Sequence, residues 1–279
     1  REDNGGQAHY LAYFPYLKDL KSFSEIMSQY ITNINLSSQS TNLNGADLLK
    51  IVKHCSGIFI PAHAFTPHKS FYGNAFSSFK EVFSQKEWDE IPAIELGLSA
   101  DTKLADYLSE LKDKSFLSNS DAHSLPKIAR EYNIFKMKEL NFEEFSYVLK
   151  NKNNRKIVKN YGMDPRLGKY HRSYCPECNK RFSLEKTIGK CTICGSDKLI
   201  TGVKDRVLHI SNKDKSISPE FRGEYVYQVP LLNLPGIGKK TLKKLIENLG
   251  TEMKILHYAS YEKIKSFHSE LSFLVKTFF

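Results

Sequence analysis

Residues 116–124 read Phe-Leu-Ser-Asn-Ser-Asp-Ala-His-Ser. The apolar start predicts a β-strand, and the polar residues that follow predict the loop at its end. Asp121 and His123 stand two positions apart and therefore point to the same side of an extended chain. A carboxylate and an imidazole that leave a strand together suit a hard or borderline divalent metal ion. Alone the pair is a weak signal, because Asp and His are common near turns.

Two further histidines occupy comparable places in the same half of the chain. Residues 60–63 read Ile-Pro-Ala-His, so that His63 ends a predicted strand and opens a loop. His9 lies in the strand-like run 8–13, where a lone histidine is more often packed in a core than bound to a metal. Together with Asp121 and His123, these residues form the inventory that a catalytic metal cluster needs.

The first half of the chain alternates predicted strands with predicted helices, which indicates an α/β fold with a mainly parallel sheet or a barrel. Active sites of such folds lie where strands end, as His63, Asp121 and His123 do. Four or five strands are too few to close an eight-stranded barrel, so we expect a partial one. The predicted strands cover 8–14, 57–61, 93–96 and 116–119, and the predicted helices cover 47–54, 104–112 and 142–150.

The formal net charge of +10 is unevenly distributed. Residues 1–149 hold 15 basic and 19 acidic residues, whereas 150–279 hold 26 and 12. A basic second half predicts a polyanionic partner, with a solvated basic surface as the alternative. No apolar run is long enough to cross a membrane, and no signal peptide is visible, so we expect a cytoplasmic protein without a membrane partner. The first residue, Arg1, predicts that the chain starts inside a domain.

Four of the five cysteines form two Cys-x-x-Cys pairs separated by twelve residues. Each pair turns two thiolates toward one ion, and two pairs complete a closed tetrahedral shell, which predicts a structural zinc site. A redox pair is the disfavoured alternative, because it needs a thioredoxin-like context. The predicted ligands are Cys175, Cys178, Cys191 and Cys194, and the predicted basic connector and zinc module span 151–212.

Residues 231–245 contain Leu-Pro-Gly-Ile-Gly-Lys-Lys between two apolar helical patterns. The glycines predict a tight turn, and the free N–H groups at the start of the next helix offer a site for an anion. The pattern resembles a helix-hairpin-helix, which holds a nucleic-acid phosphate without reading sequence. An ordinary helical hairpin with a solvated basic face is the alternative. The predicted DNA-binding region is 213–279, with Gly236, Ile237, Gly238, Lys239, Lys240 and Thr241 at the phosphate.

Several strings resemble one known family. The strings 60–67, 94–101 and 118–124 resemble a polymerase-and-histidinol-phosphatase (PHP) domain and, more narrowly, the endonuclease Q group of DNA-repair nucleases. Residues 129–133 and 164–171, the four cysteines and the hairpin continue the resemblance, and the hairpin is similar to that of the bacterial form.

The resemblance implies a distorted α/β barrel in residues 1–150 with up to three divalent ions, Zn²⁺, Mn²⁺ or Mg²⁺. Asp121, His123, His63 and His9 match family ligands, and Glu95 matches a recurrent Glu that we do not expect to be a ligand. Lys169 and His171 lie in the string 164–171 and are further candidate DNA contacts. The family's opening His-x-His motif, a further His and a Glu should precede residue 1, so the chain resembles the last two-thirds of such an enzyme.

The implied function is metal-dependent cleavage of DNA on the 5′ side of deaminated bases (uracil, hypoxanthine, xanthine) or abasic sites. The expected partners are double- or single-stranded DNA with damaged bases, and a sliding clamp or another repair protein is a further candidate. Two alternatives stay open: a DNA-binding remnant without catalysis, and a PHP phosphoesterase that acts on small phosphate esters.

Overall fold

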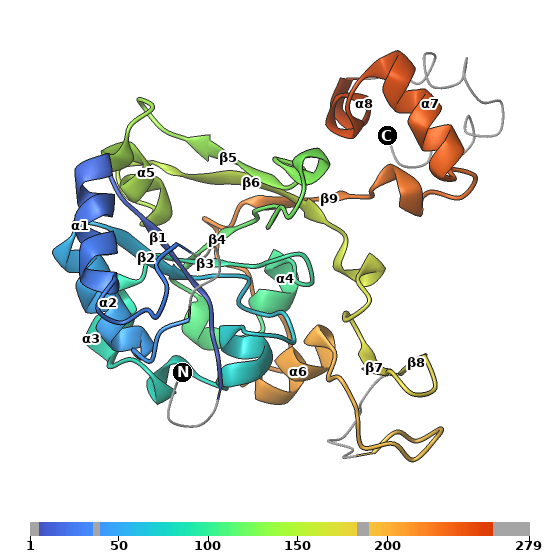
Figure 1. Cartoon of the computed structure of the whole chain (residues 1–279), viewed down its shortest axis with the longest axis horizontal. Coiled ribbons are helices and arrows are strands. Elements are labelled where there is room, and N and C mark those ends of the chain that lie inside the picture. Colours follow the sequence, from blue (N-terminus) through green and yellow to red (C-terminus); the bar gives the residue numbers. More distant parts are fainter. Residues whose placement is uncertain (1–5, 36–39, 183–189, 259–279) are drawn as a thin grey trace.

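The computed structural model describes residues 6–35, 40–182 and 190–258. Figure 1 shows an α/β body, a hairpin of β7 (Ser173–Cys175) and β8 (Lys180–Phe182) beside α6, and a pair of helices, α7 and α8, that projects from the end of β9. The elements of the body are β1 (Tyr10–Tyr13), α1 (Leu17–Met27), α2 (Gly45–His54), β2 (Ile58–Pro61), α3 (Gln85–Glu90), β3 (Ala93–Glu95), α4 (Thr102–Ala105), β4 (Ser115–Leu117), β5 (Tyr132–Lys136), α5 (Phe142–Leu149), β6 (Lys156–Met163), α6 (Val203–Ile210) and β9 (Glu224–Gln228). A π-helical turn (Phe71–Ala75) and short 3₁₀ turns (Phe79–Glu81, Ser109–Leu111, Leu125–Lys127, Pro165–Leu167) connect them.

The strands of the body form a mixed arrangement rather than a mainly parallel one. β1 pairs antiparallel with β2, β3 pairs parallel with β4, and β6 lies between antiparallel β5 and parallel β9. Ala64 N, just past β2, donates to the Glu95 carbonyl of β3 (2.9 Å), and the Asn160 amide of β6 donates to the Phe116 carbonyl of β4 (2.8 Å). The chain is therefore of the expected α/β class, and the partial barrel stays a prediction.

The helix expected over 104–112 is wrong in extent. Asp101 caps α4, with its Oδ1 accepting from Leu104 N (2.7 Å), and the helix ends at Ala105. The next residue, Asp106, is buried and paired with Arg222 (2.7 Å), so its side chain is held by a partner far along the chain. The strand around His9 begins later than expected, at Tyr10, and is half-buried rather than buried.

The body continues past residue 150, where a polar connector was expected. Residues 156–163 form β6, and Val203 and Val207 of α6 are buried in the main core with Trp88. The polar sequence of β6 conceals its burial, because Asn160 is 1% exposed and satisfied by hydrogen bonds. The interpretation of the first part of 151–212 as a connector is therefore wrong for β6. The division of the chain into three functional units stays a prediction.

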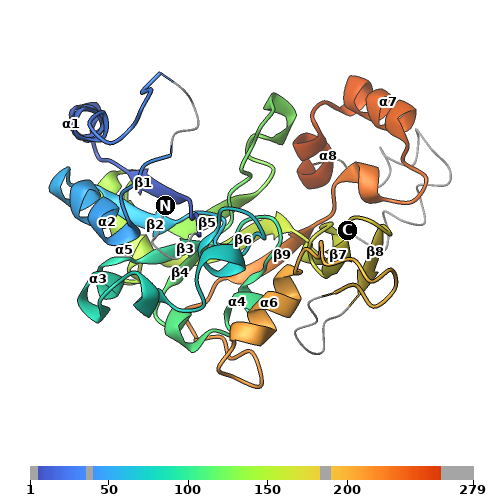
Figure 2. The same cartoon turned by 60° about the horizontal axis from the view of Figure 1, so that its bottom comes forward.

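The last described elements form a small unit with its own apolar core. A 3₁₀ turn (Leu231–Asn233) precedes α7 (Lys239–Leu249) and α8 (Glu252–Tyr258). Figure 2 shows this unit apart from α1 and connected to the body through β9. Residues 259–279 of the predicted DNA-binding region lie outside the described residues. The buried side chains are Leu231, Leu234, Ile237, Leu245 and Ile255.

None of the described helices combines the length and apolarity that a membrane span requires.

Candidate metal and nucleic-acid sites

The predicted metal ligands line one cavity of about 950 Å³. His9 precedes β1, His63 follows β2, and Asp121 and His123 follow β4, so the ends of neighbouring strands bring them together. The rest of the lining is largely apolar and comes mainly from α1, the residues after it and α2. The structure therefore places the four residues on one cavity, and their role as metal ligands stays a prediction.

His9 and His63 are close enough to share an ion. His9 Nδ1 lies 3.0 Å from His63 Nε2. Two nitrogens bound to one ion at about 2.0–2.1 Å stand about 3.0–3.4 Å apart, so the pair fits a common metal. Burial lowers the pKa of His9, and the neighbouring His63 and Lys69 lower it further. A lowered pKa keeps the imidazole neutral, which is the form that binds metals.

Glu95 and Thr66 orient the His63 residue. The Glu95 Oε2 accepts the His63 backbone N–H (2.9 Å), and the Thr66 hydroxyl contacts His63 Nδ1 (3.1 Å). Such outer contacts set the direction and tautomer of a ligating imidazole. Burial raises the pKa of Glu95 to about 6, although the His63 N–H favours the carboxylate. No motif in the sequence indicates the role of Thr66.

Asp121 and His123 form a second, more exposed pair. Asp121 Oδ1 lies 3.7 Å from His123 Nε2, and their side chains are 49% and 85% exposed. Asp121 (φ 44°) and His63 (φ 29°) both adopt the left-handed backbone region, which non-glycine residues occupy mainly at functional or strained sites. Across 6–35, 40–182 and 190–258, no three of the cavity's His, Asp and Glu side chains converge on a single ion position. The cavity thus holds two donor pairs, and their role as ligands stays a prediction.

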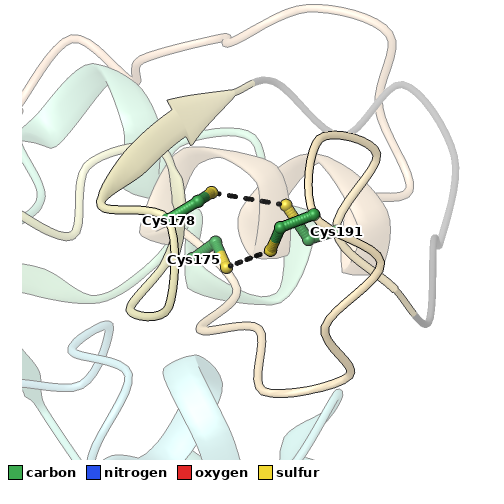
Figure 3. Close-up of side chains that lie close together, drawn as sticks. Cys175, Cys178 and Cys191 are labelled. Atoms are coloured by element: carbon green, nitrogen blue, oxygen red, sulfur yellow. Dashed lines mark hydrogen bonds between the residues drawn. The ribbon is translucent and has the colours of Figure 1, made fainter.

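The four cysteines converge as their spacing predicts. Cys175 and Cys194 Sγ atoms are 3.6 Å apart, Cys178 and Cys191 Sγ atoms are 3.7 Å apart, and all four lie within 4.8 Å of one another. Figure 3 shows the sulfur atoms of Cys175, Cys178 and Cys191 turned toward a common centre. A tetrahedral shell with Zn–S bonds of 2.3 Å has sulfurs about 3.8 Å apart, so the cluster fits zinc.

Local backbone geometry prepares this cluster. The first knuckle lies between β7 (Ser173–Cys175) and β8 (Lys180–Phe182), and Gly195 closes the second with φ 72°. The pKa of the Cys191 thiol is lowered to about 7, first by the backbone N–H of Cys194 and also by that of Ile193. A thiolate is the form that binds metal, so the turn itself favours binding.

The glycine turn of the predicted hairpin has the expected local form. Gly236 adopts φ 81°, Gly238 is the N-cap of α7, and beyond the adjacent residues no described atom lies within 4 Å of the position that a Cβ would take on either glycine. Lys239 and Lys240 are exposed beside this helix start, Thr241 is half-buried, and Ile237 is buried in the small core. Ile246 is 40% exposed, because α7 packs chiefly through Leu245.

The two DNA-contact candidates before the zinc module differ in exposure. Lys169 is exposed, and its Nζ lies 4.5 Å from the centre of the Tyr174 ring. His171 is half-buried, its Nδ1 has no hydrogen-bond partner among the described residues, and burial followed by Arg172 and Lys204 lowers its pKa. Of the two, Lys169 is better placed to meet a phosphate.

No family model matches the chain. It is 45% identical over 260 residues to the uncharacterised protein YqxK of Bacillus subtilis, covering 93% of this chain and 65% of that protein. It is 36% identical over 236 residues to an uncharacterised protein of Methanocaldococcus jannaschii, covering 77% of this chain and 29% of that protein. The chain thus spans less than two-thirds of the length of these curated relatives.

Two solved structures resemble the chain over 97% of its length, each with a TM-score of 0.81 and 32% sequence identity. One is the lesion-specific endonuclease PfuEndoQ of Pyrococcus furiosus, of which the chain covers 70%. The other is endonuclease Q in complex with a 27-mer duplex substrate that carries an abasic lesion at the active site, of which the chain covers 72%.

Proposed function

Because the chain belongs to the endonuclease Q family, we propose that it serves metal-dependent cleavage of a DNA phosphodiester on the 5′ side of a deaminated base or an abasic site. The observation that carries this proposal is the meeting of the His9–His63 and Asp121–His123 pairs on one cavity. The nitrogen and oxygen donors of these two pairs suit divalent ions such as Zn²⁺, Mn²⁺ or Mg²⁺, which are the proposed cofactors.

Each residue has a distinct part in the proposal. Divalent ions, when bound, supply an activated water and neutralise charge on the scissile phosphate. His9 and His63 offer imidazole nitrogens beside two paired strands, and Glu95 fixes the direction of His63 through its backbone N–H. Asp121 adds the negative charge that a divalent ion requires, at the open rim where a phosphate can approach.

The rest of the chain holds the DNA in this proposal. The four-cysteine cluster keeps the β7–β8 segment folded, because so small a module buries little apolar surface. The start of α7 offers free N–H groups and exposed lysines to a backbone phosphate. Contacts of this kind position a duplex without reading its sequence, which suits an enzyme that acts at lesions.

The decisive test is nicking of a uracil-containing duplex by the full-length protein carrying Asp121→Asn. We expect cleavage to be abolished while the fold is retained, because the amide keeps the shape and removes the charge. Asp113→Asn is the matched control, since the Asp113 side chain is 78% exposed and lies outside the cavity. Retained cleavage in the Asp121 variant would remove this residue from the mechanism.

A second candidate is a DNA-binding role without catalysis. The observation that favours it is the lack of a three-donor group at the cavity within the described residues. Both functions predict that replacing Gly236 and Gly238 with bulkier residues weakens DNA binding, so DNA cleavage is the measurement that distinguishes them. Binding that depends on this turn, together with no cleavage at uracil, hypoxanthine or abasic sites under any divalent ion, would favour the binding role.

A further inference from the structure

We propose that a strip of basic and aromatic side chains leads one nucleic-acid strand from the metal cavity to the zinc module. The strip consists of Lys69, His68, Tyr170 and Lys169, and the buried ring of Tyr174, 7% exposed, supports Lys169 at its end. It rests on the proposed function in one respect, that the ligand is DNA. It assigns the path along which the strand leaves the site.

The strip begins at the cavity wall. Lys69 lines the cavity, and its carbonyl accepts the backbone N–H of His9 (3.0 Å), so its position is tied to a predicted ligand. Its backbone has φ 49°, a conformation that non-glycine residues rarely adopt. Lys69 and His68 are both exposed, which leaves an ammonium group and an imidazole ring on the surface beside the donor pairs.

Aromatic rings continue the strip across a gap of a hundred residues in sequence. The His68 ring meets the Tyr170 ring edge to face, with centroids 5.5 Å apart and planes at 86°. The Lys169 Nζ lies 5.5 Å from the Tyr170 centroid and 4.5 Å from that of Tyr174, which directly precedes the first zinc ligand. Alternating rings and cations are the arrangement with which proteins bind single strands, because bases stack and phosphates pair with lysine.

Backbone hydrogen bonds join the strip to the body. Val203 N donates to the Tyr170 carbonyl (2.8 Å), and Lys204 N donates to the His171 carbonyl (3.0 Å). Val203 belongs to α6, whose apolar face is buried in the main core. Figure 1 shows β7 beside α6 at the edge of the body. A surface fixed before binding loses little entropy when a ligand arrives.

The competing explanation is that these contacts only pack the zinc module against the body. The two explanations differ in whether a base of the bound DNA stacks on a protein side chain. If a DNA strand follows the strip, one of its bases stacks on the Tyr170 ring. If the contacts only pack the zinc module against the body, no base stacks on Tyr170. The salt dependence differs as well, because each lysine that pairs with a phosphate adds about one unit to the slope of log K against log salt.

The experiment uses the full chain and a duplex with a single-stranded arm that contains 2-aminopurine, whose fluorescence falls when it stacks. We expect quenching with the wild-type chain and with Tyr170→Phe, and its loss with Tyr170→Ala together with about tenfold weaker binding. Lys69→Ala and Lys169→Ala should each lower the salt slope by about one, whereas Lys112→Ala, an exposed lysine outside the strip, should not.

Three outcomes are informative. If Tyr170→Ala unfolds, the lysine variants still test the strip through their salt slopes. If the wild-type chain binds DNA and neither quenching nor slopes respond to the strip variants, the strip is overturned and the proposed function stands. If the wild-type chain binds no DNA, the proposed function fails with it.

Discussion

Replacing Asn133 with alanine should loosen the loop that carries Asp121 and His123. The Asn133 Oδ1 accepts from Ser118 N (2.8 Å) and from the Asn160 amide (2.8 Å), and its Nδ2 donates to the Ser118 carbonyl (3.0 Å). The Asn133 side chain thus pairs with the backbone N–H and carbonyl of Ser118, just after the end of β4, as a neighbouring strand would. Because Ser118 is 2% exposed and Asn160 is 1% exposed, the variant leaves buried groups unpaired.

The magnitude follows from this inventory. The amide of Asn160 keeps its bond to the Phe116 carbonyl, so the main loss is the N–H and carbonyl of Ser118. Two buried unpaired groups cost about 3–4 kcal/mol of unfolding free energy, which lowers Tm by about 10 °C in a chain of this size. The control Asn212→Ala removes an exposed acceptor for Ser109 N and should cost no more than about 1 kcal/mol.

Thermal and urea unfolding followed by circular dichroism measure the change. The variant Asn133→Asp provides a second test through its pH dependence, because its carboxylate would face the Ser118 carbonyl. This repulsion raises the folded-state pKa of the new carboxyl, so the destabilisation should be full at pH 7 and fade as pH falls toward the unfolded value of about 4. Nicking by the full-length Asn133→Ala protein should fall even where the protein is folded. An Asn133→Ala protein as stable as Asn212→Ala would refute the reasoning.

Three further predictions concern the zinc cluster and two buried cations. Cys191→Ser should lower the bound zinc and the Tm, as inductively coupled plasma analysis and calorimetry would show; unchanged zinc stoichiometry would end the structural-zinc claim. Arg222→Met should cost about 3–5 kcal/mol, because the Asp106 carboxylate stays buried, while the double variant with Asp106→Leu should recover most of it in urea titrations. Burial lowers the pKa of Lys114 to about 8, below its unfolded value of about 10.4, so stability should rise between pH 8 and 10 in the wild type. Lys114→Met should remove this rise, and an identical pH profile would contradict the argument.

The sequence was sufficient where a few neighbouring residues determine the structure. The spacing of Cys175, Cys178, Cys191 and Cys194 predicted their convergence, because each pair is closed by one tight turn. The start of α7 at Lys239 followed from the glycine turn, and the apolar runs that end before His63 and Asp121 predicted strands. The resemblance of short strings also anticipated the endonuclease Q fold.

The tertiary structure alone decided which distant residues meet. His9 reaches His63 across 54 positions, Asn133 holds Ser118, and Arg222 neutralises Asp106 in the core. Such buried polar residues break the alternation of apolar and polar positions, which is why β6 appeared to be a connector. Local sequence propensity does not predict such buried polar residues. Each can be buried only because folding brings its hydrogen-bond or ion-pair partner beside it, away from water.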